Sequence, residues 1–280
     1  MSAPTRVRTL SGQRIAITGA GRGIGRATAE ELHRRGALVA IGDIDVDAAK
    51  DAATAIGSDV TAHQLDVTDS ESFDSFVADA TQAMGGLDVL INNAGVMPIG
   101  HFLDIDETTV RRAAEINLLG PTLGMRAVLP ALIAQGHGHV VNVASVAGKA
   151  AVPGGLYYCS HKAGVIALTE GARLEFADRG IDFTCVMPSF TNTDLIAGTK
   201  GTKLLKNVEP EDVAKAIAEA IEHKHKDVYL PRSLRQITFT QSVVGRRVRD
   251  FLNRRLGAYE TFLDIDKAGR AAYDDRVSKS

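Results

Sequence analysis

Residues 18–25 read TGAGRGIG, a glycine-rich stretch between an apolar run and a helical pattern. Before it, residues 14–17 (RIAI) are short and largely apolar, which is typical of a buried strand. After it, apolar residues recur at helical spacing until Gly36. Glycine permits a tight turn close to a ligand, and the following helix N-terminus attracts phosphate. The stretch predicts a strand–turn–helix unit that binds a dinucleotide; a glycine-rich turn without a ligand is the alternative.

The glycine spacing narrows the kind of dinucleotide turn. Gly19, Gly23 and Gly25 follow the pattern G-x-x-x-G-x-G. This differs from the G-x-G-x-x-G fingerprint of other dinucleotide-binding folds. The pattern alone is a moderate signal, so the rest of the chain has to support it.

Length and composition set wide limits. The chain has 280 residues, 45% of them hydrophobic, so it can bury a sizeable core as one large domain or two small ones. We expect no apolar run long enough to cross a bilayer and no signal peptide at residues 1–12. The two cysteines, Cys159 and Cys185, have neither a disulfide framework nor a metal-ligand spacing. This usage predicts a cytoplasmic protein, and we expect no metal site: residues 136–139 (GHGH) read as a turn.

Charge separates the end of the chain from the rest. Residues 232–280 hold eleven Lys and Arg against six Asp and Glu, a balance of +5, whereas the other residues sum to −7. We therefore expect a catalytic domain over residues 1–231 and a C-terminal extension over 232–280. Its apolar residues approach helical spacing and arginines surround them: Ile237, Val244, Val248, Phe251 and Leu252, with Arg235, Arg246, Arg247, Arg249, Arg254 and Arg255.

This basic amphipathic segment allows several partners. It can cap the substrate cleft or contact another subunit, and these are the preferred interpretations. A peripheral contact with an anionic membrane through residues 232–256 comes second. Nucleic-acid binding is not expected, because the charge excess is modest and aromatic residues do not interleave with the basic ones.

Strand and helix patterns alternate along the chain. The expected helices cover 45–56, 70–84, 107–134 and 212–222, with kinks at Pro121 and Pro130. The expected strands cover 14–17, 37–43, 60–67, 87–91, 139–144, 181–187 and 227–230. Such alternation predicts one doubly wound parallel sheet with helices on both faces and ligands at the carboxyl ends of its strands. Special residues fall at these ends: Gly19, Asp43, Asp66, Asn93, Ser145 and Pro188.

An acid at the end of the second strand bears on the cofactor. Asp43 lies 24 residues after Gly19. A carboxylate there can accept hydrogen bonds from both ribose hydroxyls of an adenosine, and it repels a 2′-phosphate. This favours NAD over NADP, although Arg22 in the glycine turn could meet such a phosphate. The alternative for Asp43 is an acid at the start of the following helix.

The reactive constellation begins with Tyr158 and Lys162. They are four residues apart and share one helix face. An ammonium group lowers the pKa of a neighbouring phenol from its usual value of about 10, so Tyr158 could act as a general acid–base near neutral pH. Ser145, at a strand end, could hold the substrate oxygen. Asn117 could orient a water that links Lys162 to solvent. Tyr157 lacks a lysine four residues on, so it is not the candidate.

Together these motifs resemble the short-chain dehydrogenase/reductase family over residues 12–230. The matching segments are Thr18-Gly19-x-x-x-Gly23-x-Gly25, Asn92-Asn93-Ala94-Gly95, Asn117, Ser145 and Tyr158-x-x-x-Lys162. The resemblance implies a Rossmann-type seven-stranded sheet in the order 3-2-1-4-5-6-7, hydride transfer to or from nicotinamide, and a homodimer or homotetramer. It implies that Tyr158 is the acid–base, Ser145 the substrate anchor, Lys162 the activator of Tyr158 and a ribose ligand, and Asn117 the support of a proton relay.

The resemblance also implies where the cofactor lies. Asp66 and Val67 would flank the adenine, and Asn93 would lie near the adenine-side ribose. Residues 188–193 read PSFTNT where the family has Pro-Gly-x-Val-x-Thr, so the Gly and Val positions are replaced. Thr193 can still hold the carboxamide. The expected cofactor-binding residues are Gly19, Arg22, Gly23, Ile24, Gly25, Asp43, Asp66, Val67, Asn93, Ala94, Gly95, Tyr158, Lys162, Pro188, Thr191 and Thr193.

The expected substrate pocket is apolar, and no Lys or Arg stands out there to receive a carboxylate or phosphate. This favours an apolar secondary alcohol or its ketone, such as a lipid or sterol, unless several of these side chains are simply core. An NADPH-dependent 3-ketoacyl thioester reductase and a non-catalytic nucleotide-sensing or scaffold protein are the alternatives. The pocket residues are Val96, Met97, Val146, Leu156, Phe190 and Leu195.

Overall fold

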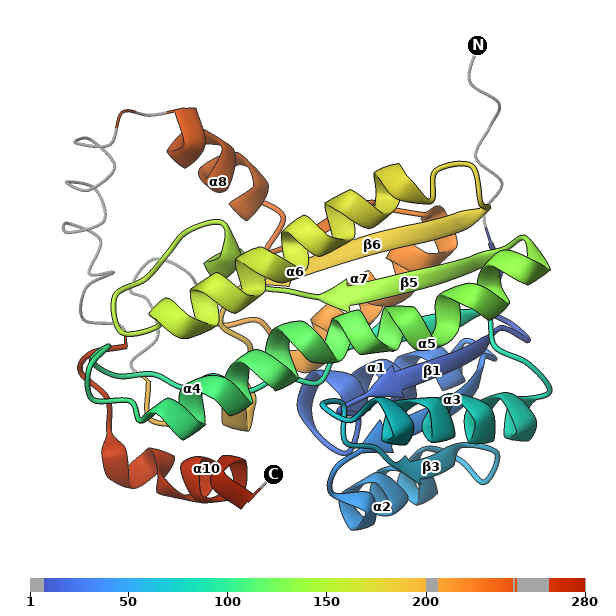
Figure 1. Ribbon diagram of the computed structural model, residues 1–280, viewed down its shortest axis with the longest axis horizontal. Helices are drawn as coiled ribbons and strands as arrows, with labels where there is room; N and C mark the ends of the chain where they lie inside the picture. The colour runs from blue at the N-terminus through green and yellow to red at the C-terminus, as the bar shows by residue number, and fades with distance from the viewer. Residues whose placement is uncertain (1–7, 200–205, 244, 246–261, 280) are drawn as a thin grey trace.

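The central strands are apolar on both faces, and the structure buries them between two layers of helices (Figure 1). It is a computed structural model that describes residues 8–199, 206–243, 245 and 262–279. The seven strands pair in parallel in the order β3-β2-β1-β4-β5-β6-β7, which confirms the expected doubly wound sheet. They are β1 (Arg14–Thr18), β2 (Leu38–Asp43), β3 (Thr61–Gln64), β4 (Val89–Asn92), β5 (Gly138–Val143), β6 (Ile181–Pro188) and β7 (Asp227–Leu230).

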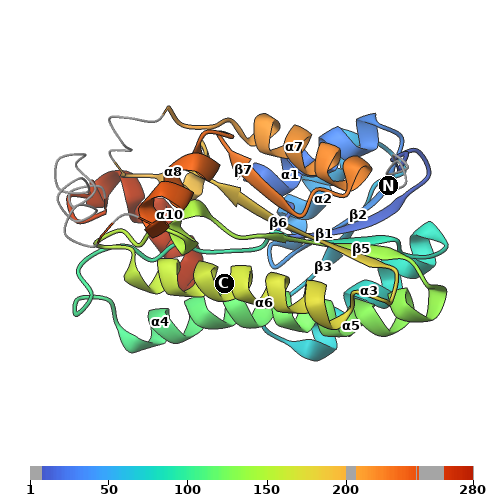
Figure 2. The same ribbon diagram turned by 90° about the horizontal axis from the view of Figure 1, so that it is seen from above.

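Each face of the sheet has its own core. Along β1, Ile15 and Ile17 join one cluster while Ala16 joins the other, because successive side chains point to opposite faces. Figure 2 shows the two layers of helices above and below the strands. One holds α1 (Gly23–Arg34), α2 (Val46–Ile56) and α7 (Pro210–His223); the other holds α3 (Ser70–Met84), α4 (Glu107–Ala114), α5 (Gly120–Gln135) and α6 (Leu156–Glu175).

The third strand is shorter than the pattern over 60–67 predicts. It covers only Thr61–Gln64. Beyond it Asp66 turns the chain, because its carboxylate accepts hydrogen bonds from both the backbone N–H and the hydroxyl of Thr68, at 2.9 and 2.7 Å. The turn lets Asp69 cap α3 by accepting from the N–H groups of Glu71 and Ser72.

The long helix expected at 107–134 is interrupted. A π-helix of five residues, Glu115–Leu119, separates α4 from α5 and contains Asn117. Contrary to expectation, the combined segment Glu107–Gln135 is long and apolar enough to span a membrane, with a mean hydropathy of 1.4 in its best window. Half of that window is buried in the fold, and α5 packs on β4 and β5. Packing on the sheet therefore accounts for its apolar character.

The predicted C-terminal extension is described in part. Two helices belong to it, α8 (Leu234–Val243) and α10 (Lys267–Lys279), and both lie at the end of the molecule toward which β5 points (Figure 1). The remaining residues of the expected basic helix lie outside the described residues: Val244, Arg246, Arg247, Val248, Arg249, Phe251, Leu252, Arg254 and Arg255.

A buried histidine on β5 predicts a pH-dependent stability. His139 is fully buried, and its Nε2 lies 2.8 Å from Thr184 Oγ1. Burial lowers its pKa to about 3, so the folded protein keeps it neutral while the unfolded chain takes up a proton near pH 6.5. The free energy of unfolding should therefore fall as the pH falls below that value.

We expect His139→Gln to weaken this dependence, because glutamine can still bond to Thr184 and does not titrate. Between pH 7 and pH 5 the wild type should lose about 2 kcal/mol more than the variant. Urea unfolding at both pH values measures this. Equal losses in the two proteins would contradict the assignment.

Candidate active site

The glycine turn is fastened to the end of β4. The buried Thr18 hydroxyl accepts hydrogen bonds from the N–H groups of Asn93 and Ala94, at 3.0 and 3.1 Å. In return, Asn93 Nδ2 donates to the carbonyls of Thr18 and Gly19. Gly19 has a φ of 63°, and a Cβ there would lie 2.7 Å from Ala94 Cα. The turn can approach β4 this closely only because that residue is glycine.

Gly25, which was predicted to contact the cofactor, is closely packed in the structure. A Cβ on Gly25 would lie 2.4 Å from the Gly19 carbonyl oxygen and 2.5 Å from Asn93 Nδ2. It does not line the cavity that the other turn residues Gly19, Arg22, Gly23 and Ile24 line. Gly25 instead lets α1 begin against the turn.

Two acids follow β2 beside the turn. Asp43 Oδ2 accepts a hydrogen bond from the N–H of Gly21 at 2.9 Å, so this carboxylate also holds the turn. Arg22, which could have met a phosphate, forms an ion pair with Asp45 at 2.7 Å. Asp43, Arg22 and Asp45 all line the cavity. Asp45 also caps α2, which is the alternative role considered for Asp43.

A third acid marks the far end of the same cavity. Asp66 and Val67 line it as predicted, together with Arg112, which was not predicted. Arg112 Nη2 lies 3.3 Å from Asp66 Oδ2. This ion pair contributes to keeping the pKa of Asp66 below its ordinary value, although partial burial acts in the opposite direction.

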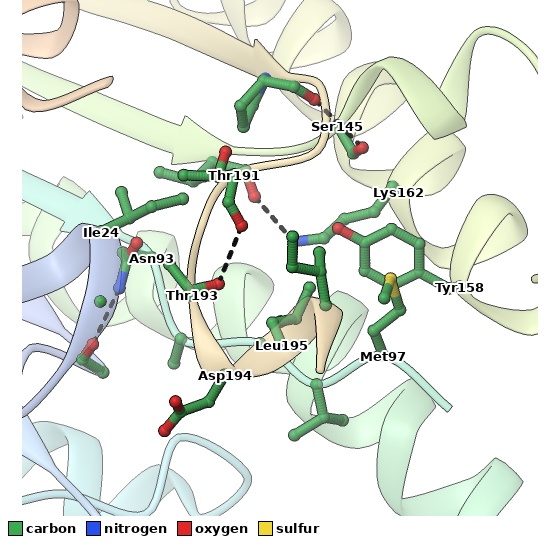
Figure 3. Close-up of a pocket in the computed structure, with 18 of the residues that line it drawn as sticks. Ile24, Asn93, Met97, Ser145, Tyr158, Lys162, Thr191, Thr193, Asp194 and Leu195 are labelled. Carbon is green, nitrogen blue, oxygen red and sulfur yellow. Dashed lines mark hydrogen bonds between the residues drawn. The ribbon is translucent and has the colours of Figure 1, made fainter. Parts of the chain in front are cut away.

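Tyr158, Lys162 and Ser145 meet at the other end of the cavity (Figure 3). All three are buried, with exposed fractions of 7%, 4% and 7%. Lys162 Nζ donates to the Val143 carbonyl at 2.8 Å and lies 5.7 Å from the centroid of the Tyr158 ring. Ser145 Oγ accepts from the N–H of Ala147 at 3.1 Å. Tyr157, by contrast, is half-buried and donates its hydroxyl to the Phe102 carbonyl.

The predicted lowering of the Tyr158 pKa is not found in the chain by itself. Burial raises the pKa of Tyr158 well above its usual value, and only the hydrogen bond with Ser145 acts in the opposite direction. Burial also lowers the pKa of Lys162 to about 8, which weakens it as a source of positive charge. The physical reason is shared: both side chains lack the water that would solvate their charged forms.

Asn117 fixes the chain on which the pocket is built. Its Oδ1 accepts from the N–H of Val96 at 2.9 Å, and its Nδ2 donates to the Val96 carbonyl at 2.7 Å. A Cβ on Gly95 would lie 3.0 Å from Asn117 Oδ1 and 3.5 Å from Lys162 Nζ. The side chain therefore positions residues 95–96 next to Lys162, and the predicted water relay stays a prediction.

The opposite wall follows β6 (Figure 3). The Thr191 hydroxyl donates to the Ser189 carbonyl at 3.2 Å, and the Thr193 hydroxyl donates to the Thr191 carbonyl at 3.4 Å. Thr191 also forms a bridge with Val208. The segment thus keeps a defined turn although Ser189 and Thr191 replace the Gly and Val of the family motif. Pro188, Thr191 and Thr193 all line the cavity.

One cavity of about 1010 Å³ joins these parts. Asn93, Ala94 and Gly95 form its floor between the glycine turn and Lys162. Of the predicted substrate residues, Val96, Met97, Val146, Phe190 and Leu195 line it. Leu156 begins α6, is 46% exposed and is not among the residues that line the cavity, so its place in the substrate pocket stays a prediction.

Several lining residues escaped sequence reasoning. Gly21 could have been found, since it belongs to the glycine stretch. Arg112 lies on a helix with ordinary amphipathic spacing and gave no signal. Phe262 and Tyr273 lie more than a hundred residues after Tyr158, and only the shift in charge marked their segment.

Comparisons with known proteins agree with this geometry. The short chain dehydrogenase family profile matches residues 13–204. Estradiol 17-beta-dehydrogenase 11 of Rattus norvegicus is 31% identical over 259 residues, which cover 90% of this chain and 87% of that protein. Sorbitol dehydrogenase of Cereibacter sphaeroides is 41% identical over 180 residues, covering 64% of this chain and 70% of that one.

A solved structure shares the fold. It is the 3-ketoacyl-(acyl-carrier-protein) reductase of Brucella melitensis complexed with NADH, which superposes with a TM-score of 0.73 at 25% identity. The match covers 79% of this chain and 97% of that chain. On the family profile, the strand order and the relatives together, this chain is an oxidoreductase of the short chain dehydrogenase family.

Proposed function

We propose that the protein transfers a hydride between a nicotinamide cofactor and an apolar secondary alcohol or its ketone, with Tyr158 as the acid–base. The observation that carries this proposal is the shared cavity. The glycine turn that suits a diphosphate and the buried group Tyr158, Lys162 and Ser145 open into the same space. A protein that only senses a nucleotide has no need of these three side chains at the far end of its binding cleft.

The residues present fit a dinucleotide. Gly19 and Gly23 have positive φ angles and present backbone at the start of α1, where a diphosphate is favoured. Asp43 lines the cavity beside the turn and would accept a hydrogen bond from a ribose hydroxyl. Gly95 leaves the space beside Lys162 Nζ open. When bound, the cofactor supplies or accepts the hydride and, in its oxidised form, brings a positive charge.

The chain's own side chains would manage the proton. Tyr158 would take the proton of the alcohol during oxidation and return it to the oxygen during reduction. Ser145, which lines the same end of the cavity as Tyr158, would hold that oxygen. Lys162 would stabilise the phenolate of Tyr158, and a second positive charge in the cavity would oppose the effect of burial on the pKa of Tyr158.

The substrate class follows from the lining near Tyr158. Met97, Ile99, Tyr158 and Phe262 form one buried cluster, with Phe190 and Leu195 packed against it. The relatives bear the names of a steroid and of a sugar alcohol, so their names support CH–OH chemistry without a common substrate. The apolar lining favours a steroid-like or lipid-like alcohol over a polyol. The homodimer or homotetramer that the family implies stays a prediction.

Tyr158→Phe tests the assigned chemistry. We expect the variant to bind the cofactor as tightly as the wild type and turnover to fall by at least about 10²-fold, because the acid–base is gone while the ring remains. The cofactor Kd is measured by titration, and turnover of secondary alcohols by nicotinamide absorbance. Tyr157→Phe is the matched control and should keep wild-type turnover, since its hydroxyl bonds only to the exposed loop. Unchanged turnover in Tyr158→Phe would refute the role.

We further propose NAD as the preferred cofactor. Asp43 and Asp45 both line the cavity beside the turn, and Arg22 is already paired with Asp45. A 2′-phosphate would therefore meet two carboxylates and a cation whose charge is partly compensated.

Asp43→Asn tests this preference. Asparagine can still accept the hydrogen bond from Gly21, so the turn should persist while the negative charge is lost. We expect the ratio of NAD to NADP affinity to fall about tenfold, which corresponds to about 1.4 kcal/mol. Asp47→Asn is the control, because Asp47 is 89% exposed and lies outside the cavity. A wild-type preference for NADP would contradict the proposal.

A further inference from the structure

The substrate end of the cavity is closed by residues outside the matched family region. The family profile ends at residue 204, yet Phe262 and Tyr273 line the cavity. Phe262 is 3% exposed and belongs to the same apolar cluster as Tyr158 and Met97. Residues near the end of the chain therefore pack beside Tyr158.

Glycines in the body of the enzyme make room for this return. A Cβ on Gly154 would lie 2.6 Å from the Phe262 carbonyl oxygen, and one on Gly155 would lie 2.9 Å from Phe262 Cδ2. Gly198 is similar, since a Cβ there would lie 2.5 Å from the Asp266 carbonyl oxygen. The contact at three separate glycines indicates an interface built into the sequence.

Arg270 fastens α10 to both sides of the cavity. It is 1% exposed and donates to the carbonyls of Leu195 and Ala197 on one side, at 3.3 and 3.1 Å, and to that of Met97 on the other. Asp274 accepts from its Nε at 3.0 Å. A buried guanidinium held by three carbonyls and a carboxylate fixes a segment far more firmly than an exposed ion pair does.

Tyr273 adds a second attachment on the Met97 side. Its buried hydroxyl accepts a hydrogen bond from the N–H of Met97 at 2.8 Å. The Arg270 guanidinium lies 4.5 Å from the centroid of its ring. The helix is thus bound to the loop after β4 and to the 3-10 turn Asp194–Ile196 at once.

We propose that residues 262–279, the C-terminal segment, form the closing wall of the substrate site. In this wall, Phe262 sets the size of the alcohol that can reach Tyr158, and Arg270 is the positioning residue that holds the wall in place. Phe262 meets the Phe190 ring at a centroid distance of 5.4 Å, so the two rings limit the depth of the pocket from opposite segments. The inference rests on the proposed function, because it assigns the substrate side of that same site.

The test compares substrates of increasing size. Oxidation of isopropanol, cyclohexanol and decalinol with NAD is measured for the wild type and for the variants Phe262→Ala and Phe262→Leu. We expect the ratio of kcat/KM for decalinol to that for isopropanol to rise about tenfold or more in Phe262→Ala, and less in Phe262→Leu. The NAD affinity should not change, since Phe262 lies at the substrate end.

Leu174→Ala is the matched control, because Leu174 is an apolar side chain that is 81% exposed on α6. It should keep the wild-type ratio. The proposal is overturned if both Phe262 variants retain the wild-type ratio. If the wild type oxidises no alcohol, the proposed function fails. The attachment of the C-terminal segment is then tested by a measurement that needs no turnover.

That measurement is hydrogen exchange at two neighbouring amides. The Met97 amide is held by Tyr273, whereas the Val96 amide is held by Asn117. In Arg270→Met we expect exchange at Met97 to speed up at least tenfold and exchange at Val96 to change little. Arg276→Met removes a half-buried arginine of the same helix that pairs with Asp194 but is not held by backbone carbonyls, and it should have a smaller effect. Unchanged protection of Met97 in Arg270→Met would refute the fastening.

Discussion

The site depends on hydrogen bonds between the ends of β1 and β4, where the strand order of the sheet reverses. β1 pairs with β2 on one side and with β4 on the other, and the chain from each leaves in opposite directions. Thr18 and Asn93 join these strands at their ends through reciprocal hydrogen bonds. Because backbone groups buried here need partners, the two bonds also satisfy the turn that a dinucleotide would approach. The floor of the cavity is therefore part of the fold and does not need a ligand to form.

Burial governs the chemistry at the other end. Burial shifts both Tyr158 and Lys162 toward their neutral forms, because the cavity wall removes water from each. A positive charge entering the cavity reverses this balance for the phenol. In the proposed reaction, Tyr158 would therefore depend on the charge of a bound ligand to reach its phenolate form.

Sequence patterns predicted the part of the molecule that obeys periodicity. The alternation of strands and helices, the glycine turn, the strand-end Ser145 and the helix with Tyr158 and Lys162 follow from local rules, whereas the family resemblance supplied the strand order. The other features depend on contacts in three dimensions, which local sequence patterns do not show. The sequence does not show whether Leu156 faces the pocket, because one residue on a helix changes face by 100°. It also does not separate the two roles of Gly25, because packing and ligand contact call for the same residue type. Phe262 and Arg270 could not be predicted, because their partners lie more than seventy residues away in the chain.

The three glycines under the C-terminal segment constrain how this protein can diverge. Any side chain at residue 154, 155 or 198 would collide with residues 262–266, two of these positions having φ angles of 81° and 72° besides. The three glycines and the C-terminal segment that packs on them must therefore be conserved together. In a chimera that carries this C-terminal segment on a relative without the glycines, the segment could not pack against the catalytic domain. A change of substrate range among such relatives would therefore require paired substitutions.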